Sequence, residues 1–135
     1  LGLFSLARDY SSLLNPRYYR PIYIHSKLFI ADGARCCIGS GNISFQSLHR
    51  DGEAAFDILA PDQIRAFQGA LWDEHYGEGG AALMNLPPEQ AFAAWQARAT
   101  ENAGHVQGRR ALKGRILPID LARYGEPLAS GRPAD

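Results

Sequence analysis

The sequence predicts an α/β fold in which a mixed β-sheet is flanked by helices, and three observations support this class. Apolar residues alternate with polar ones over 22–31, which is typical of a strand with one buried face. Asp32-Gly33 then forms a strong two-residue hairpin signal, and 34–38 provides a returning strand. Two helical patterns follow, each opened by proline, after residues 60 and 86.

The first predicted strand has two chemically different faces. Its alternation predicts an apolar face made of Ile22, Ile24, Leu28 and Ile30. Because side chains alternate along a strand, Tyr23, His25 and Lys27 share the opposite face. A further strand is expected over 54–59, after a polar stretch.

The helical patterns predict two amphipathic helices. The first starts at Pro61-Asp62 and stops at Gly77, with Ile64, Phe67 and Leu71 on one face. The second starts at Pro87-Pro88-Glu89, and its apolar face holds Phe92, Trp95 and Ala99. From Gly104 onward the chain is rich in Gly, Arg and Pro, which predicts loops, and 1–20 shows no regular pattern.

Composition excludes some classes of protein. The 135 residues are 46% hydrophobic and carry a formal net charge of zero, so we expect a packed core and no overall attraction to nucleic acid or to an anionic membrane. No apolar run is long enough to span a bilayer. Cys36 and Cys37 are adjacent, so on a strand they point to opposite faces, which argues against a disulfide or a shared zinc site.

Four polar residues suit chemistry at a phosphate. His25 and Lys27 lie two apart on a predicted strand, and the hairpin turn returns the loop with Ser40 and Asn42 to the same region. Lys27 and Asn42 can donate hydrogen bonds to phosphoryl oxygens, while an imidazole can attack phosphorus or move a proton. These residue types in this pattern indicate a site for a tetrahedral phosphate.

The spacing of these residues resembles a known signature. His25-x-Lys27, four residues, Asp32, six residues and Gly39-Ser40-x-Asn42 are similar at every fixed position to the HxKxxxxD(x6)GSxN signature of the phospholipase D superfamily. Ser47 and Glu53 fall where that family has a serine and an acidic residue, and 71–77 resembles its Leu-Trp-x-Glu-His-x-Gly helix end. The resemblance points to bacterial phospholipase D and cardiolipin synthase-like enzymes, although Ser44 and Gln46 replace the Asn and Arg that family members often have.

The resemblance implies a fold, a mechanism and a set of site residues. The chain would be the C-terminal half of a phospholipase D fold, and two half-sites would act through a phosphohistidine without metal or cofactor. Glu53 would hydrogen-bond His25, and His25 would act as the general acid and base. The implied catalytic residues are His25, Lys27, Ser40, Asn42 and Glu53, with Lys27 and Asn42 binding substrate and Asp32, Gly39 and Ser47 supporting the motif.

We divide the chain into 1–20, a remnant of a preceding region, 21–77, a phospholipase D-like half-domain, and 78–135, a helical and loop extension. The expected reaction is hydrolysis or transphosphatidylation of a phospholipid, with a second half-site in cis or in trans and a peripheral membrane contact. We expect the isolated chain, as a fragment with one half-site, to be inactive. Two alternatives stay open: a homodimeric nuclease of the same superfamily, and an inactive half that only folds and pairs.

Overall fold

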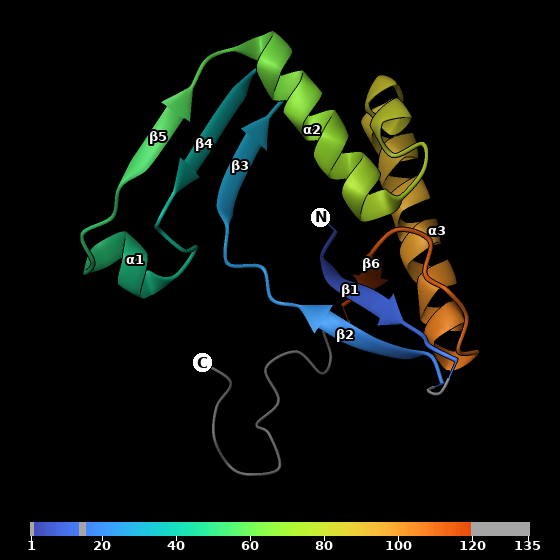
Figure 1. Cartoon of the computed structure of the whole chain (residues 1–135). Coiled ribbons are helices and arrows are strands. Elements are labelled where there is room, and N and C mark those ends of the chain that lie inside the picture. The colour runs from blue at the N-terminus through green and yellow to red at the C-terminus, as the bar shows by residue number, and fades with distance from the viewer. Residues whose placement is uncertain (1, 14–15, 120–135) are drawn as a thin grey trace.

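The computed structural model describes residues 2–13 and 16–119, and this part of the chain contains six strands and four helical segments. Figure 1 labels them in chain order. They are β1 (Phe4–Tyr10), β2 (Tyr18–Ile22), β3 (Lys27–Ala31), β4 (Arg35–Gly39), α1 (Phe45–His49), β5 (Ala55–Ile58), α2 (Pro61–Tyr76), the 3₁₀ helix η1 (Ala81–Asn85), α3 (Pro88–Gln107) and β6 (Ile116–Pro118).

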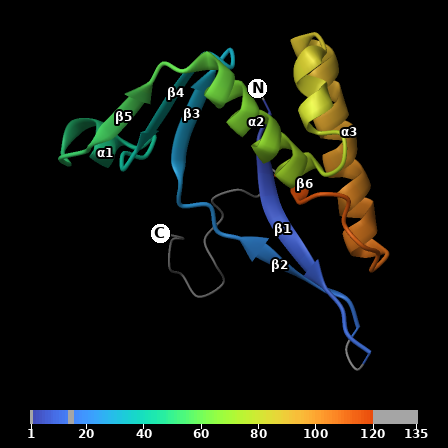
Figure 2. The ribbon, with the colours of Figure 1, turned by 45° about the horizontal axis from the view of Figure 1, so that its top comes forward.

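The strands form two small sheets, in the orders β2-β1-β6 and β3-β4-β5, and all the strand pairs in the described residues are antiparallel. In Figures 1 and 2 the segment between β2 and β3 connects the sheets, and α2 runs from the β3-β4-β5 sheet toward α3. The α/β class predicted from the sequence is therefore confirmed, as two antiparallel sheets flanked by helices.

The main core lies where α3 packs near the β2-β1-β6 sheet. Leu6 of β1 pairs with Ile22 on one side and with Ile116 on the other. Ile116 and Ala99 are almost completely buried, and they form a cluster with Leu6. Burial of aliphatic side chains is the largest favourable contribution to folding, so this cluster holds β1 and β6 against α3.

The β3-β4 hairpin turns at Asp32-Gly33, as the sequence predicts, but the connection has three residues, 32–34, and not two, because Ala31 pairs with Arg35. Asp32 and Gly33 both have positive φ, 51° and 63°, as a type I′ turn requires. The Ala34 N–H donates to the Ala31 carbonyl across the turn at 2.9 Å. Asp tolerates this left-handed conformation better than most residues, and Gly adopts it without a steric penalty.

The strand predicted over 22–31 is wrong in one respect, because the structure divides it. β2 ends at Ile22 in one sheet, β3 begins at Lys27 in the other, and 23–26 belongs to neither. The apolar alternation continues through the break, but Tyr23 is 83% exposed and Ile24 is 51% exposed. The alternation of apolar residues does not reveal this division, because β2 and β3 are distinguished only by the different strands with which they pair.

Three regions contain regular structure that the sequence analysis did not predict. Residues 1–20 contain β1, which is stabilised by pairing on both of its edges. The polar stretch after Asn42 contains the short helix α1, capped by Ser44, whose Oγ accepts from the Ser47 N–H at 3.2 Å. Beyond Gly104 the helix α3 continues to Gln107, and β6 follows, so this region is not only loops.

The two helices predicted from proline starts are confirmed. α2 begins at Pro61, buries Ile64, and ends before Gly77, whose φ of 93° stops it. α3 begins at Pro88, one residue after the first proline of the predicted start, and buries Ala99 from the predicted apolar face.

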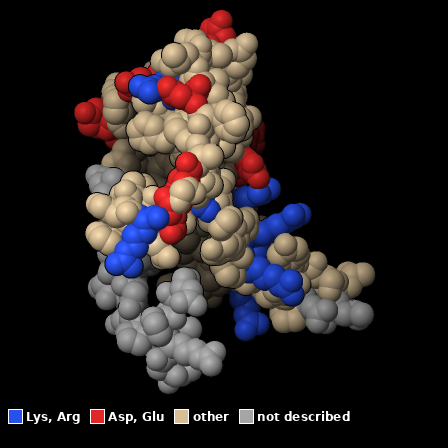
Figure 3. Space-filling view, turned by 90° about the vertical axis from the view of Figure 1, so that its left-hand side faces the viewer, with Lys and Arg blue, Asp and Glu red and all other residues tan. Residues whose placement is uncertain are grey.

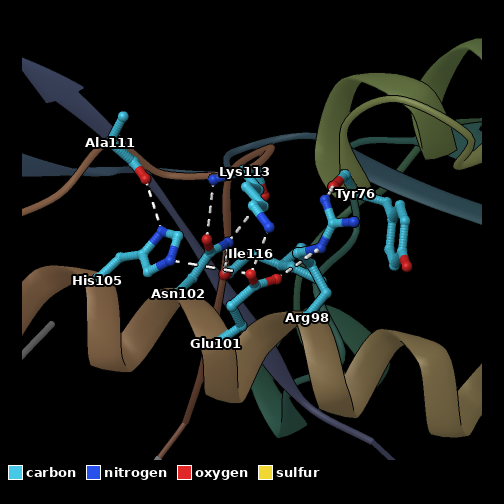
Figure 4. Close-up of polar contacts among 8 residues, drawn as sticks. All are labelled: Tyr76, Arg98, Glu101, Asn102, His105, Ala111, Lys113 and Ile116. Carbon is cyan, nitrogen blue, oxygen red and sulfur yellow. Dashed lines mark hydrogen bonds and ion pairs between the residues drawn. The ribbon is translucent and has the colours of Figure 1, made fainter.

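Side chains of α3 fasten the loop that leads to β6, as Figure 4 shows. The completely buried Asn102 donates to the carbonyls of Lys113 and Ile116 at 2.9 Å each and accepts from the Lys113 N–H at 2.9 Å. His105 Nδ1 lies 2.7 Å from the Ala111 carbonyl, and Glu101 pairs with Lys113 Nζ at 2.5 Å. This network satisfies the loop backbone and holds β6 beside β1.

Candidate active site at the open end of the β3-β4 hairpin

The hairpin brings Lys27 next to the glycine loop. Lys27, the first residue of β3, pairs directly with Gly39, the last residue of β4. Asn42 follows in the loop, and Glu53 precedes β5, which pairs with β4. Lys27, Asn42 and Glu53 all line one cavity of about 530 Å³. An ammonium group, an amide and a carboxylate therefore surround a space large enough for a small ligand.

Ser40 fastens the loop to the strand opposite. Its hydroxyl donates to Glu53 Oε2 at 2.5 Å and accepts from the Ala54 N–H at 3.1 Å. Its backbone N–H donates to the Ala54 carbonyl at 2.9 Å. The hydroxyl proton of Ser40 is thus engaged in the hydrogen bond to Glu53. Ser40 therefore positions Glu53 within the site.

Glu53 is held in its ionised form. Hydrogen bonds from Ser40 and then from Ser47 keep the pKa of the Glu53 carboxyl below its ordinary value, and the charge of Lys27 acts in the same direction. Ser47 comes from α1, so this short helix supplies one of the contacts. At neutral pH the cavity consequently holds one carboxylate and one ammonium group.

Gly39 allows the segment that leads into β5 to pack closely against the end of β4. A Cβ on Gly39 would lie 2.8 Å from the Ala54 carbonyl oxygen and 2.9 Å from the Ala55 Cβ, so β5 could not approach a larger residue. A Cβ on Gly41 would lie 3.4 Å from the Glu53 side chain, which is an ordinary van der Waals distance. Gly39, a fixed position of the signature, thus permits the close approach that brings Glu53 to the loop.

His25 lies in the segment between the sheets. Its imidazole stacks on Tyr23, with the ring centroids 5.8 Å apart and the planes at 23°. Its carbonyl oxygen accepts from Lys27 Nζ at 2.8 Å. Within residues 2–13 and 16–119, the Glu53 carboxylate bonds Ser40 and Ser47, and it does not bond the His25 ring. The structure thus brings together five of the predicted site residues: Lys27, Ser40, Asn42, Ser47 and Glu53. His25 contacts this group through its backbone carbonyl, which accepts from Lys27.

Asp32 lies at the other end of the hairpin. It occupies the turn, whereas Lys27 and Gly39 form the open end. The five residues of β3 separate the two ends by roughly 15 Å at the rise of an extended strand. Asp32 therefore acts on the hairpin conformation and not on a ligand in the cavity.

The sequence analysis did not single out all of the residues around this site. Ser26 and Ile43 also line the cavity, and each is a direct neighbour of a signature residue. Tyr23 was predicted on the face of His25, and its ring does contact the imidazole, although 23–26 belongs to neither strand. Ser26 and Ile43 could both have been predicted, because each is adjacent in sequence to a residue of the signature.

The surface around the cavity is not strongly basic. Figure 3 shows Lys and Arg side chains gathered toward the β1-β2 hairpin, where Arg8 and Arg20 lie over the rings of Tyr10 and Tyr18. In the described ranges we find no cluster of His, Cys, Asp or Glu that could hold a metal ion. No helix among the residues that the structure places is long and apolar enough to cross a membrane.

The structure defines an α/β protein with a cavity lined by Lys27, Asn42 and Glu53 beside a glycine loop, and the curated homologues of the chain are phospholipases D. Phospholipase D alpha 1 of Nicotiana tabacum is 31% identical over 121 residues, which is 81% of this chain and 15% of that protein. Phospholipase D alpha 1 of Ricinus communis is 30% identical over 127 residues, which is 78% of this chain and 15% of that protein. Phospholipase D A of Dictyostelium discoideum is 35% identical over 85 residues, which is 50% of this chain and 6% of that protein.

The chain spans about 15% of the length of the first of these relatives. No protein-family model matches the chain, and no solved structure matches it. The relatives come from plants and a slime mould, so the closeness to bacterial enzymes stays a prediction.

Proposed function

We propose that this chain is a half-site of a phospholipase D-type phosphodiesterase, which hydrolyses a phospholipid or transfers its phosphatidyl group to an alcohol. The observation that carries the proposal is the cavity lined together by Lys27, Asn42 and Glu53, at the loop that the signature specifies. The similarity to phospholipases D over 81% of the chain supports the same reaction class.

Lys27 and Asn42 are the groups that would hold the phosphate. An ammonium and an amide N–H donate to phosphoryl oxygens, and they stabilise the charge that grows on these oxygens in the transition state. Glu53 lies in the same cavity as Lys27 and attracts it, so the phosphodiester contacts of this half-site rest on hydrogen bonds from Lys27 and Asn42. Ser40 and Ser47 keep Glu53 in place through their hydrogen bonds.

The reaction that we propose needs a second half-site, in cis or in trans. Its histidine attacks phosphorus and forms an N–P bond, while the bond from phosphorus to the leaving alcohol breaks. His25 gives its proton to that alcohol and then takes a proton from water or an acceptor alcohol, whose oxygen displaces the histidine from phosphorus. No metal or cofactor is required for this sequence of steps.

Exposed apolar side chains next to the cavity support a partner surface. Ile43, which lines the cavity, is 103% exposed, and Phe45 and Leu48 of α1 are also exposed. Adjacent exposed apolar residues of this size are a feature of surfaces that bind other protein surfaces. A second half-site that covers them would also enclose the cavity and exclude water from it.

The substrate class follows from charge. A nuclease needs a basic groove that neutralises several phosphates, whereas this cavity is lined by one lysine and one glutamate. Two basic side chains of the C-terminal region form ion pairs within the chain and so are not free to neutralise phosphates: Arg115 pairs with Glu74, and Lys113 pairs with Glu101. We therefore favour a phospholipid over nucleic acid.

A transphosphatidylation assay tests the proposal. Phosphatidylcholine and ethanol are incubated with the chain alone and with the chain expressed within its longest reading frame, each with and without His25→Ala. We expect phosphatidylethanol only where a second half-site is present, and none after His25→Ala. Phosphatidylethanol formed by the His25→Ala protein, or cleavage of DNA with no action on lipid, would overturn the proposal.

Trapping the phosphohistidine intermediate shows which of the two histidines is the nucleophile. In the active protein, acid quenching during turnover with phosphorus-labelled substrate should leave label on the histidine of the other half-site. Label on His25 would reverse the roles that we propose, with His25 as the nucleophile.

A further inference from the structure

The end of the β1-β2 hairpin combines apolar, aromatic and basic side chains. Leu13, in the loop after β1, is fully exposed. Tyr10 and Tyr18 are the strand pair nearest to this loop, and Arg8 and Arg20 form the pair two residues behind them. Figures 1 and 2 show that this end of the hairpin lies away from the β3-β4-β5 sheet. Leucine, tyrosine and arginine therefore follow one another from the loop toward the body of the protein.

Arg8 and Arg20 face each other across the two strands. They are partners in the antiparallel register, and both are exposed. Like charges directly opposite each other destabilise a strand pair. The one acidic residue of the two strands, Asp9, pairs with Arg17, and within the described ranges neither Arg8 nor Arg20 has an ion pair. An anion bound to both guanidinium groups would relieve their repulsion.

The two guanidinium groups are held against tyrosine rings. The rings of Tyr10 and Tyr18 stack with their centroids 5.4 Å apart and their planes at 18°. The Cζ atom of Arg20 lies 5.4 Å from the Tyr18 centroid and 5.9 Å from the Tyr10 centroid. The Cζ atom of Arg8 lies 5.4 Å from the Tyr10 centroid. These cation–π contacts order both groups in the unbound chain, so less conformational entropy is lost when they bind an anion.

The opposite side of the hairpin is also basic. Tyr19 lies on that side, because neighbouring side chains alternate along a strand. Its hydroxyl oxygen lies 2.7 Å from the carbonyl oxygen of Arg110 and 3.1 Å from that of His105. The loop after α3, with the exposed Arg109 and Arg110, is therefore beside β2. Figure 3 shows Lys and Arg side chains gathered at this end of the protein, although its formal net charge is zero.

We propose that the β1-β2 hairpin docks the protein on a bilayer that contains anionic lipids. Leu13 enters the apolar layer, Tyr10 and Tyr18 lie at its boundary, and Arg8 and Arg20 contact lipid phosphates. The arginine pair lies roughly 7 Å behind the tyrosine pair at the rise of an extended strand. Membrane proteins place tyrosine at the level of the headgroups and basic side chains beside anionic lipid, which is the order along this hairpin.

The exposed leucine favours a bilayer over nucleic acid as the anionic partner. A polynucleotide offers phosphates to the arginines, but its backbone offers no apolar surface to Leu13. A bilayer offers both, since an apolar layer lies directly beneath its phosphates. Tyr10 and Tyr18 are 38% and 44% exposed, and their amphipathic rings suit the boundary between these layers.

Docking is separate from the chemistry of the proposed half-site. None of the hairpin residues lines the cavity of Lys27, Asn42 and Glu53. A protein that cannot dock would still act on a soluble short-chain lipid, and a half-site that proved inactive would still bind vesicles. Docking is therefore measured as binding, without any assay of turnover.

Vesicle sedimentation measures docking directly. The chain is mixed with vesicles of phosphatidylcholine alone and with vesicles of equal parts phosphatidylcholine and phosphatidylglycerol. We expect saturable binding to the mixed vesicles that weakens as salt is added, because salt screens the arginines. Vesicles of phosphatidylcholine alone, whose choline cancels the charge of its phosphate, should bind little of the chain.

Reversal of one charge separates docking from folding. Arg8→Glu should weaken binding to the mixed vesicles roughly 25-fold, because it removes one cation and adds an anion beside the other. The same variant should unfold at a higher urea concentration, since a carboxylate opposite Arg20 replaces a repulsion by an attraction. Arg65→Glu, on an exposed position of α2, makes the same change in net charge and should bind nearly as the unmodified chain does.

Substitution of the exposed leucine tests insertion. Leu13→Ser should weaken binding to the mixed vesicles about tenfold, because the apolar side chain no longer leaves water. Leu59→Ser is the matched control, since Leu59 is 73% exposed and lies between β5 and α2, away from the hairpin. It should leave the affinity unchanged.

Several results would overturn the proposal. They are equal binding to the two kinds of vesicle, binding by Arg8→Glu as tight as that by Arg65→Glu, and an unchanged affinity in Leu13→Ser. Fluorescence anisotropy with a labelled single-stranded oligonucleotide tests the rival partner. Binding to the oligonucleotide that is tighter than to the mixed vesicles, and that Arg8→Glu abolishes while Leu13→Ser does not, would assign the hairpin to nucleic acid.

Discussion

Gly39 is the residue whose lack of a side chain most directly sets the geometry of the proposed catalytic cavity. We predict that Gly39→Ala destabilises the protein by about 2 kcal/mol, because the added Cβ would meet the Ala54 carbonyl and Ala55. Urea unfolding followed by circular dichroism measures the change. Gly52→Ala is the matched control, since a Cβ there meets nothing within 4 Å and should change stability by less than about 0.5 kcal/mol. Equal stability of the two variants would contradict the close approach of β5.

Glu53 gives the site a pH dependence with a defined sign. Its pKa in the folded chain lies below the ordinary 4.5, because Ser40 and Ser47 donate to the carboxylate and Lys27 attracts it. Such a group stabilises the fold above its unfolded pKa, and this contribution is lost as pH falls through the lowered pKa. We predict that Glu53→Gln is less stable than the unmodified chain near pH 7 and that this difference narrows as the pH falls below 4.5, as urea unfolding at a series of pH values would show. A difference in stability that does not change with pH would contradict this role.

At the scale of secondary-structure elements, the loop between α3 and β6 depends on one amide. Asn102→Ala should destabilise the fold by about 3 kcal/mol, because it leaves buried backbone groups of Lys113 and Ile116 without partners. Thermal and urea unfolding measure this loss. Thr100→Ala, on the exposed side of the same helix, should leave stability within about 0.5 kcal/mol. A near-neutral Asn102→Ala would mean that packing alone holds β6.

The elements that the sequence could predict are those with local signals. The Asp32-Gly33 turn, the proline starts of α2 and α3, and Gly77 each act within a few residues, and each prediction is confirmed. β1 and β6 could not be predicted, because their pairing joins opposite ends of the chain. The division of 22–31 was missed for the same reason, since only the partner strands show where one sheet ends.

The spacing of the site residues in the sequence indicated which of them lie close together in the fold. The Asp32-Gly33 turn predicts that the loop after β4 returns beside Lys27, but it does not predict the register. A two-residue turn would pair Lys27 with Ile38, whereas its partner is Gly39. The role of Ser40 could not be predicted from the sequence either, because its bond to Glu53 depends on how β5 returns beside β4. The position of the His25 ring beside Tyr23 also depends on the break between the sheets.

At the scale of the whole molecule, charge and exposed surface indicate how the chain would work. Its formal net charge is zero, and several of its exposed apolar residues lie on α1 and on both faces of the β3-β4-β5 sheet, as Phe29 and Phe56 show. Such a molecule binds partners through apolar contact more than through long-range attraction. This agrees with a half-site that another half-site covers.

The most direct test of the account is whether a phosphodiester binds between Lys27 and Asn42. The chain labelled with nitrogen-15 is titrated with soluble dihexanoyl-phosphatidylcholine, and its amide resonances are followed by NMR. We predict that saturable shifts concentrate at Lys27, at 39–42 and at Glu53, and that a folded Lys27→Ala chain loses them. Shifts centred on the arginines of the β1-β2 hairpin, or shifts that persist in Lys27→Ala, would contradict the proposed site.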